Sequence, residues 1–377
     1  MRSYLELALR APAYFSFRRM GWPEIFPVNY TLSITNQCNS ACKTCFIWRL
    51  YREKPELKEE ELSTNEWLEV ISSLGRSPFW ITISGGEPFL RKDLVELCRA
   101  MCEANSPRII NIPTNGLLPD RVRNWTGKIA EACEENHVSL VINLSIDGIG
   151  EEQDAIRGVR GCWSRVLKSL EGLRELKDKH PGLTVGIHTV VSRYNVGRLG
   201  EIAKHILEEL RPDHYIMEVA EERSELFNVG TGITPTPGEL ARALNKVIPY
   251  LRARISSSRG VSRISLLFRL EYYGLLPKIL ASRRQLVPCM ALYASCHINP
   301  YGDLWPCCIL GYEKSVGNLK EHGFDFRRLW RSKEAEEVRK FIREGKCYCP
   351  LANAHYTNLL LDPRRVLSIM LRGLLGR

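Results

Sequence analysis

Six short runs rich in β-branched and aromatic residues alternate with helical patterns over residues 29–219. The strand-like runs lie at 29–35, 79–84, 107–113, 138–146, 183–191 and 213–219. The helical patterns lie at 63–74, 91–103, 119–134, 163–176 and 197–209. Strands that alternate with helices pair in parallel, because each helix returns the chain to the starting edge of the sheet. The pattern therefore predicts an α/β fold with a partial (βα)6 TIM-like barrel.

Distinctive motifs follow the first four runs. Three cysteines follow the first run, Gly85-Gly86-Glu87-Pro88 the second, Thr114-Asn115-Gly116 the third and Asp147-Gly148 the fourth, with Ser145 just inside it. In a parallel barrel the loops that follow the strands share one rim, which is where the chemistry takes place. We therefore expect these motifs to lie close together.

Each rim motif suits one part of a small polar ligand. Gly85 and Gly86 permit close approach of the backbone to a ligand. The carboxylate of Glu87 can pair with an ammonium group, and Asp147 can accept hydrogen bonds from a ribose diol. Each motif alone is also compatible with an ordinary turn, whereas four on one rim indicate a binding site.

The cysteine motif is Cys38, Cys42 and Cys45, with the spacing C-x3-C-x2-C. Three thiolates on one short loop can hold one soft metal centre. A closed zinc site needs four protein ligands, and no His or Asp lies within the triplet. A four-iron cluster on three cysteines keeps one iron open, so the ligand count predicts chemistry at an open iron.

The distribution of cysteines indicates metal ligation in a reducing compartment. The chain has 13 cysteines, an odd number, and they concentrate at 38–45 and 289–349. This does not resemble a disulfide framework. Glu6 and Arg10 interrupt the apolar start, and no run approaches the ~20 apolar residues of a membrane span. We expect a cytoplasmic protein.

Together, the cysteine loop, GGEP, TNG and Ser145-Ile146-Asp147-Gly148 with Arg157-Gly158 and Gly161 resemble the radical S-adenosylmethionine (radical SAM) superfamily over about residues 29–220. The family binds a [4Fe-4S] cluster on three cysteines, and the amino and carboxylate groups of SAM chelate its fourth iron. The resemblance implies that Cys38, Cys42 and Cys45 are the ligands. It implies an ammonium site at Gly85, Gly86 and Glu87, ribose or carboxylate contacts at Ser145 and Asp147, and cofactor contacts at Pro88 and Asn115.

The resemblance also implies a mechanism. One electron passes from the reduced cluster into the sulfonium of SAM, giving methionine and a 5′-deoxyadenosyl radical that removes hydrogen from an unactivated carbon. A small flavodoxin- or ferredoxin-type protein is the expected electron donor. The sequence assigns no catalytic residue of the protein itself. Thr44 stands where the family usually has an aromatic residue.

A second cysteine cluster begins at Cys289, which is followed by twelve residues, Gly302, four residues and Cys307. Residues 298–303 read as a hairpin with a glycine turn, and Cys347 and Cys349 follow. This region resembles the C-terminal SPASM or twitch extension of radical SAM enzymes. The resemblance implies one auxiliary [4Fe-4S] cluster on Cys289, Cys307, Cys347 and Cys349. The alternative is a structural zinc on the same thiolates.

Two further cysteines, Cys296 and Cys308, leave the auxiliary ligand set open. Either could replace one of the four ligands, donate a hydrogen atom to a substrate radical, or be a buried bystander.

Five segments follow from these patterns. They are a basic and aromatic arm at 1–28, the radical SAM core at 29–250, a basic apolar linker or lid at 251–285, the SPASM or twitch domain at 286–352 and a basic amphipathic tail at 353–377. Thr236, Pro237 and Glu239 form a capping box with proline at the first helical position, which predicts a sixth barrel helix from Pro237 to about Arg254.

The net charge of +10 lies mainly on the attachments of the barrel, because residues 251–284 and the tail are rich in arginine among large apolar groups. Such stretches either dock on the barrel or contact an anionic membrane surface. On the second hypothesis the substrate is a lipid or lipid-linked glycan. The alternative is a peptide or protein maturase that forms thioether or carbon–carbon bonds, oxidises or epimerises.

A zinc-stabilised nucleic-acid-binding protein is the hypothesis from a different class, since the cysteines and the basic charge would suit one. It is disfavoured because the basic groups lie away from the cysteine loops. We expect no nucleic-acid partner.

Overall fold

Six parallel strands form the centre of the computed structural model. The structure describes residues 2–374; residue 1 and residues 375–377, at the ends of the predicted arm and tail, lie outside the described part. The strands are β1 (Asn29–Thr35), β2 (Trp80–Gly85), β3 (Ile109–Thr114), β4 (Ser139–Ser145), β5 (Leu183–Val191) and β6 (His214–Val219). Each strand pairs in parallel with the next. The predicted α/β barrel is confirmed.

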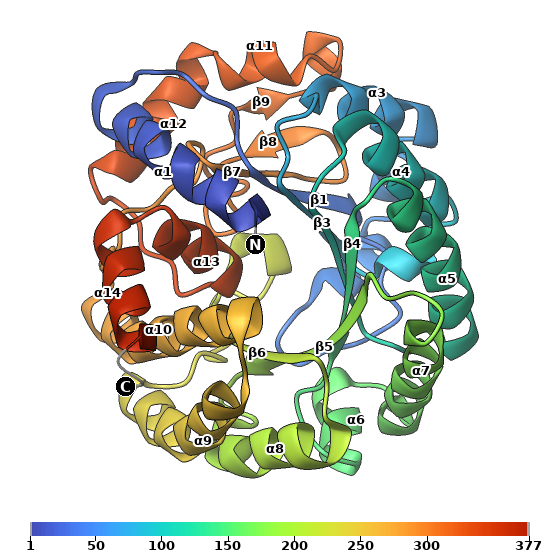
Figure 1. The fold of residues 1–377 in the computed structure, drawn as a ribbon. Coiled ribbons are helices and arrows are strands. Elements are labelled where there is room, and N and C mark those ends of the chain that lie inside the picture. Colours follow the sequence, from blue (N-terminus) through green and yellow to red (C-terminus); the bar gives the residue numbers. More distant parts are fainter. Residues whose placement is uncertain (1, 375–377) are drawn as a thin grey trace.

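The helices that follow these strands in the sequence cover the outside of the sheet (Figure 1). They are α2 (Leu50–Glu53), α3 (Thr64–Leu74), α4 (Leu94–Ala100), α5 (Pro119–Glu135), α6 (Glu151–Arg157), α7 (Cys162–Lys177), α8 (Leu199–His205) and α9 (Pro237–Ser257). Helix α9 begins with the predicted capping box between Thr236 and Glu239. Helix α6 is a short addition after β4 that the periodicity did not predict.

The two faces of the sheet have opposite character. Side chains such as Leu32, Ile83 and Ile142 point outward and are fully buried against the helices. The inner face is polar, and the side chain of Asn143 links two neighbours there. It donates to Asn111 on β3 at 2.6 Å and lies 2.7 Å from the imidazole of His214 on β6. These contacts connect β3, β4 and β6 across the inner face.

A glycine on β5 lets His214 reach across to Asn143. A Cβ atom at Gly186 would lie 2.1 Å from Nε2 of His214 and 2.2 Å from Oδ1 of Asn143. Any side chain at this position would therefore separate β4 from β6 on the inner face.

Helices α13 (Ala352–Leu360) and α10 (Gly260–Ser282) close the gap between the first and last barrel strands. Asn353 donates to Thr31 on β1, and the backbone N–H of Ala352 donates to Glu218 on β6. Helix α10 packs beside α13, and its Tyr273 hydroxyl accepts from the N–H of Met217. The segment predicted as a linker or lid is thus largely a helix packed on the barrel.

The C-terminal region extends the barrel sheet. Strand β7 (Ser295–Ile298) pairs in parallel with β1, and β8 (Asp303–Trp305) and β9 (Gly317–Asn318) continue antiparallel. The sheet order is β6-β5-β4-β3-β2-β1-β7-β8-β9. Gly302 turns the predicted hairpin with a φ of +93°. Helices α11 (Phe326–Trp330) and α12 (Lys333–Arg343) complete this region.

The two ends of the chain pack on the same side of the molecule (Figure 1). Helix α1 (Arg2–Met20) holds Arg18 against the carbonyl of Cys289 at 2.9 Å. Helix α14 (Pro363–Leu374) carries Arg365 and Arg372, which both pair with Glu271 of α10. No helix within residues 2–374 combines the length and apolar character needed to cross a bilayer.

We predict that the stability of the barrel falls as pH drops below about 6.5 partly because of His214. Burial, reinforced by Arg269 and Arg254, lowers the pKa of His214 to about 3, from a usual 6.5. Between these values the unfolded chain binds a proton that the folded protein does not, so acid favours unfolding. Urea unfolding of the wild type and His214→Gln at pH 7.5 and 5 measures this. The substitution should reduce the loss between the two pH values, and an identical loss would contradict the prediction.

Candidate functional site

The cysteine triplet lies on the loop after β1, on the rim where it was predicted. Burial raises the pKa of Cys38 and Cys45, the latter to about 12, and the nearby Cys42 thiol contributes to both shifts. Cys45 N–H also donates to the carbonyl of Cys42. The three thiols are therefore neighbours on one loop.

A single metal ion and a four-iron cluster place different demands on three thiols. Within residues 2–374, no three His, Cys, Asp or Glu side chains converge as ligands of one metal ion would. Ligands of one zinc ion, each about 2.3 Å from the metal, lie within about 4.6 Å of one another. Thiolates of a four-iron cluster each bind a different iron and can stand farther apart.

The end of helix α6 holds the cysteine loop in place. The backbone N–H groups of Ala41 and Lys43 donate to the carbonyls of Arg157 and Ile156 at 3.0 and 2.9 Å. Gly158 lies so close that a Cβ atom there would be 2.1 Å from the carbonyl oxygen of Ala41. The loop is thus fixed by a helix more than 100 residues away in the sequence.

Gly85 and Gly86 allow a close approach between two rim loops. A Cβ atom at Gly85 would lie 2.1 Å from the carbonyl oxygen of Thr35, and one at Gly86 would lie 2.3 Å from that of Gln37. Gly86 N–H donates to Thr35, and Glu87 N–H donates to Gln37. These glycines therefore pack the GGE loop directly against the start of the cysteine loop.

The carboxylate of Glu87 is 1% exposed and ties the second rim loop to the third. It accepts from Asn115 N–H at 2.7 Å, from the Thr114 hydroxyl at 2.8 Å and from Phe89 N–H at 3.1 Å. An ammonium group would share an oxygen that already has a protein donor. The assignment of Glu87 to the ammonium site stays a prediction.

The remaining rim residues lie on the same side of the barrel. The side-chain amide of Asn115 donates to Asn39 in the cysteine loop at 2.7 Å. Ser145 ends β4 half-buried, and its carbonyl accepts from Gln153 at 2.9 Å. Pro88 begins a short turn of 3-10 helix and is buried. The structure thus places Asn115 against the predicted ligand loop.

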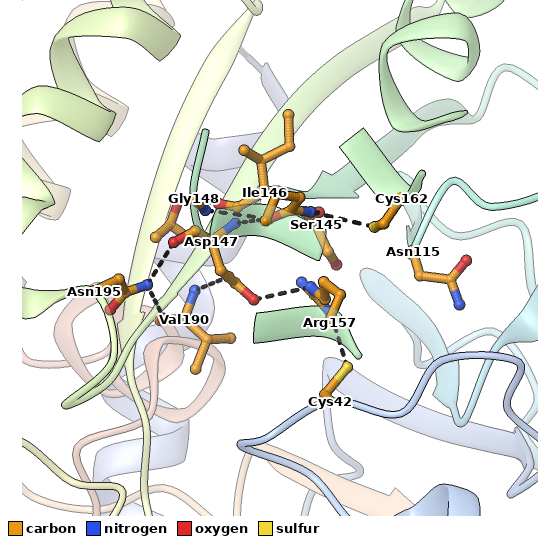
Figure 2. Close-up of polar contacts among 12 residues, drawn as sticks. Cys42, Asn115, Ser145, Ile146, Asp147, Gly148, Arg157, Cys162, Val190 and Asn195 are labelled. Carbon is orange, nitrogen blue, oxygen red and sulfur yellow. Dashed lines mark hydrogen bonds and ion pairs between the residues drawn. The ribbon is translucent and has the colours of Figure 1, made fainter. Parts of the chain in front are cut away.

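Asp147 is 1% exposed, and protein groups engage both of its carboxylate oxygens. Val190 N–H donates to one oxygen at 2.8 Å, and the guanidinium of Arg157 lies 2.9 Å from the other. The other end of Arg157 donates to the sulfur of Cys42 at 3.6 Å. Figure 2 shows this connection from Asp147 through Arg157 to Cys42. The predicted ribose contact of Asp147 is not tested by these bonds.

The four cysteines predicted to bind an auxiliary cluster lie near one another. Burial raises the pKa of Cys307 and Cys349, and the neighbouring Cys308 and Cys289 thiols raise it further in both. Burial and Cys289 also raise the pKa of Cys347, to about 11. This places Cys347 in the same group.

Cys308 lies near these thiols and also contacts a charged side chain. The guanidinium of Arg223 donates to its sulfur at 2.9 Å and pairs with Glu225 at 3.3 Å. In the same segment, Asn228 donates to the carbonyl of Thr44 in the cysteine loop at 2.9 Å. The segment after β6 therefore connects the two cysteine regions.

Sequence reasoning missed two charged residues that position the cysteine loop. Glu61 accepts from the hydroxyl of Thr35 at 2.9 Å and the N–H of Asn36 at 2.6 Å. Arg91 donates to the carbonyl of Ile34 at 2.7 Å and pairs with Asp93. Neither residue belongs to a recognisable motif, so no sequence signal could have identified them.

Comparison with known families agrees with this geometry. The profile of the radical SAM superfamily matches residues 32–206, and that of the SPASM iron-sulfur cluster-binding domain matches residues 289–350. The chain belongs to the radical SAM superfamily. Its radical SAM domain binds a [4Fe-4S] cluster and SAM, and its SPASM domain binds auxiliary iron–sulfur clusters. The predicted cofactors are confirmed for the domains.

Three curated relatives illustrate the range of this radical SAM family. The Fe-coproporphyrin III synthase of Methanosarcina barkeri is 33% identical over 48% of this chain and 41% of its own length. Mycofactocin maturase MftC of Mycolicibacterium smegmatis is 28% identical over 85% of this chain and 74% of its own length. The PqqA peptide cyclase of Bradyrhizobium diazoefficiens is 26% identical over 74% and 66%. The match thus spans less than half of the first relative.

A solved structure shares the fold of this radical SAM chain. It is described as "Native anSMEcpe with bound AdoMet and Cp18Cys peptide", has a TM-score of 0.59 and is 16% identical. The match covers 93% of this chain and 100% of that chain. At this identity the likeness supports the fold alone.

The thiols and the rim of this chain fit the cofactors of the family. Three neighbouring thiols stand on a loop fixed by α6, and three neighbouring loops meet it with backbone and polar side-chain groups. Soft thiolates are the ligands that iron–sulfur clusters require.

We predict that Gly158→Ala prevents the cysteine loop from docking and lowers the iron content after anaerobic reconstitution. Alanine at a φ of +65° costs about 1–2 kcal/mol, and its Cβ would collide with Ala41. Gly161→Ala is the matched control, because Gly161 has a similar φ of +74° and its nearest contact is 3.7 Å away. Iron analysis should show a deficit only for Gly158→Ala, and equal deficits would contradict the clash.

Proposed function

We propose that this protein is a radical SAM enzyme that removes hydrogen from an unactivated carbon of a peptide substrate. The observation that carries the proposal is the meeting of the cysteine loop with three motif-bearing loops on one rim. Cys38, Cys42 and Cys45 would hold the cluster. Bound there, the cluster and SAM supply a 5′-deoxyadenosyl radical.

The residues of the chain hold and orient the cofactor in this proposal. The backbone of Gly85, Gly86 and Glu87 offers polar groups for the methionyl ammonium, with Pro88 shaping the turn. Asn115 lies against the cysteine loop and can contact the cofactor, and Ser145 at the end of β4 can bind the ribose or carboxylate. Asp147 can contribute through an oxygen that it shares with Val190 or Arg157.

The SPASM region would hold one auxiliary [4Fe-4S] cluster on Cys289, Cys307, Cys347 and Cys349. Two arguments support one cluster over two. The four thiols neighbour one another, and the chain lacks the long late cysteine run of a full seven-cysteine SPASM domain. A flavodoxin- or ferredoxin-type protein is the proposed electron donor. The need for reduced thiols favours the cytoplasm as the compartment.

Two relatives and one contact argue for a peptide as the substrate. The relatives with the longest matches reported above are a maturase and a peptide cyclase. The segment after β6 also joins both cysteine regions, through Arg223 and Asn228.

The lipid or lipid-linked glycan hypothesis has weaker support. Leu367, Met370 and Leu371 of α14 are exposed and offer an apolar surface. However, Arg365 and Arg372 beside them pair with Glu271 of the same chain. This pairing competes with anionic lipid headgroups for the two arginines.

We predict that the anaerobically reconstituted protein, with dithionite and SAM, forms 5′-deoxyadenosine and methionine. A variant with Cys38, Cys42 and Cys45 replaced by alanine should form neither, because the cluster has lost its ligands. Cys98→Ala, which changes a thiol buried in the core, is the control and should keep the activity. Liquid chromatography with mass spectrometry measures both products.

Absence of 5′-deoxyadenosine from wild-type protein with an intact cluster would refute the radical SAM activity. Precursor peptides encoded by neighbouring genes test the substrate class. A peptide that is modified in mass by the wild type, and unchanged with the triple variant, would support the maturase.

We predict that full-length protein with intact clusters does not float with anionic vesicles in a density gradient. The expectation follows from the pairing of Arg365 and Arg372 with Glu271. Flotation with vesicles containing phosphatidylglycerol, abolished by Leu367→Glu with Leu371→Glu, would instead favour the membrane and a lipid substrate. Vesicles of phosphatidylcholine alone are the control for charge.

A further inference from the structure

A buried ion pair contacts the sulfur of one predicted cluster ligand. Arg157 and Asp147 have side chains only 11% and 1% exposed, and their charged atoms lie 2.9 Å apart. The same guanidinium donates to Cys42 at 3.6 Å. Figure 2 shows Arg157 between the carboxylate and the sulfur, at the mouth of the barrel.

Fold stability does not explain this pair. Burial of two charges costs several kcal/mol per ion, and the attraction between them roughly repays that cost, so a buried pair gives little net stability. The α6 end is already attached to the cysteine loop by the two backbone hydrogen bonds of Ala41 and Lys43. The main contribution of the guanidinium is therefore positive charge beside the Cys42 sulfur, since the loop is already attached to α6 without it.

Other contacts fix the carboxylate that orients Arg157. Val190 N–H donates to the second oxygen of Asp147, and Asn195 donates to its backbone carbonyl at 2.8 Å. Gln153 accepts from the N–H groups of Asp147 and Gly148 at 2.7 and 3.1 Å. One hydrogen bond thus fixes the carboxylate and the others fix the backbone of Asp147, so the ion pair with Arg157 forms at a well-defined position.

We propose that Arg157 is a positioning residue for the cluster. It donates a hydrogen bond to the Cys42 thiolate and raises the reduction potential of the cluster that this thiolate would bind. Asp147 holds the guanidinium in this orientation. The proposal rests on the proposed role of Cys42 as a ligand. It also gives Asp147 a function that does not require contact with the ribose.

The direction of the effect follows from charge. Reduction adds an electron to a cluster whose thiolates are already negative. A hydrogen-bond donor at a ligand sulfur, and a positive charge beside it, stabilise the reduced state more than the oxidised state. Loss of Arg157 therefore lowers the potential and makes the cluster harder to reduce.

The test is a redox titration of the full-length, reconstituted protein without SAM, followed by electron paramagnetic resonance. The signal of the radical SAM cluster is the one missing from the variant that lacks Cys38, Cys42 and Cys45. Arg157→Met should lower the ratio of reduced to oxidised cluster about tenfold at a fixed ambient potential, which is about 59 mV for one electron. Arg157→Lys keeps the positive charge, so its cluster should have a reduction potential close to that of the wild type.

Arg160→Met is the matched control, because it removes the same charge three residues away at an exposed position. It should leave the potential unchanged. A potential for Arg157→Met equal to that of the wild type would overturn the proposal, as would an equal shift for Arg160→Met. If Arg157→Met does not retain iron, Arg157→Gln and Arg157→Lys are compared instead. The proposal is then overturned if the clusters of both variants have the same reduction potential as that of the wild type.

Failure of the proposed function gives a different result. In that case the wild-type protein would lack a cluster signal that depends on Cys38, Cys42 and Cys45. A wild-type signal that is present but does not respond to Arg157 refutes this inference alone.

Discussion

The buried carboxylate of Glu87 is the interaction on which the rim depends. It joins the loop after β2 to the loop after β3, while the glycines before it pack on the chain that leads into the cysteine loop. A buried carboxylate without donors would be costly, so these hydrogen bonds are required for the loop to fold as it does. Three loops from three separate strands thereby become one surface.

Much of the barrel could be predicted because its signals are local. Strand-like runs such as 29–35 and 183–191, and the capping box before Pro237, depend on residues close together in the sequence. The observed strands β1 and β5 have those bounds, and α9 begins at Pro237. The order of motifs along the chain also placed the cysteine loop, GGEP and TNG on one rim, because parallel strands end at the same edge.

The contacts that shape the site could not be predicted, because they join residues far apart in the sequence. Arg157 appeared only as part of a motif, and nothing in the sequence indicates that its guanidinium reaches Cys42. The same holds for Glu61, Arg91 and Arg223. Periodicity also cannot show that glycines such as Gly85 face another loop, since the clash they avoid exists only in the folded chain. The closure of the barrel by α13 is equally non-local.

Strand β1 pairs with both β2 and β7. One strand belongs at once to the barrel and to the sheet of the SPASM region, so the two regions cannot swing apart without breaking the hydrogen bonds of β1. The two cysteine regions are therefore attached to one continuous sheet, which fixes their relative arrangement. If both regions hold clusters as proposed, electron exchange between them would take place across this fixed arrangement.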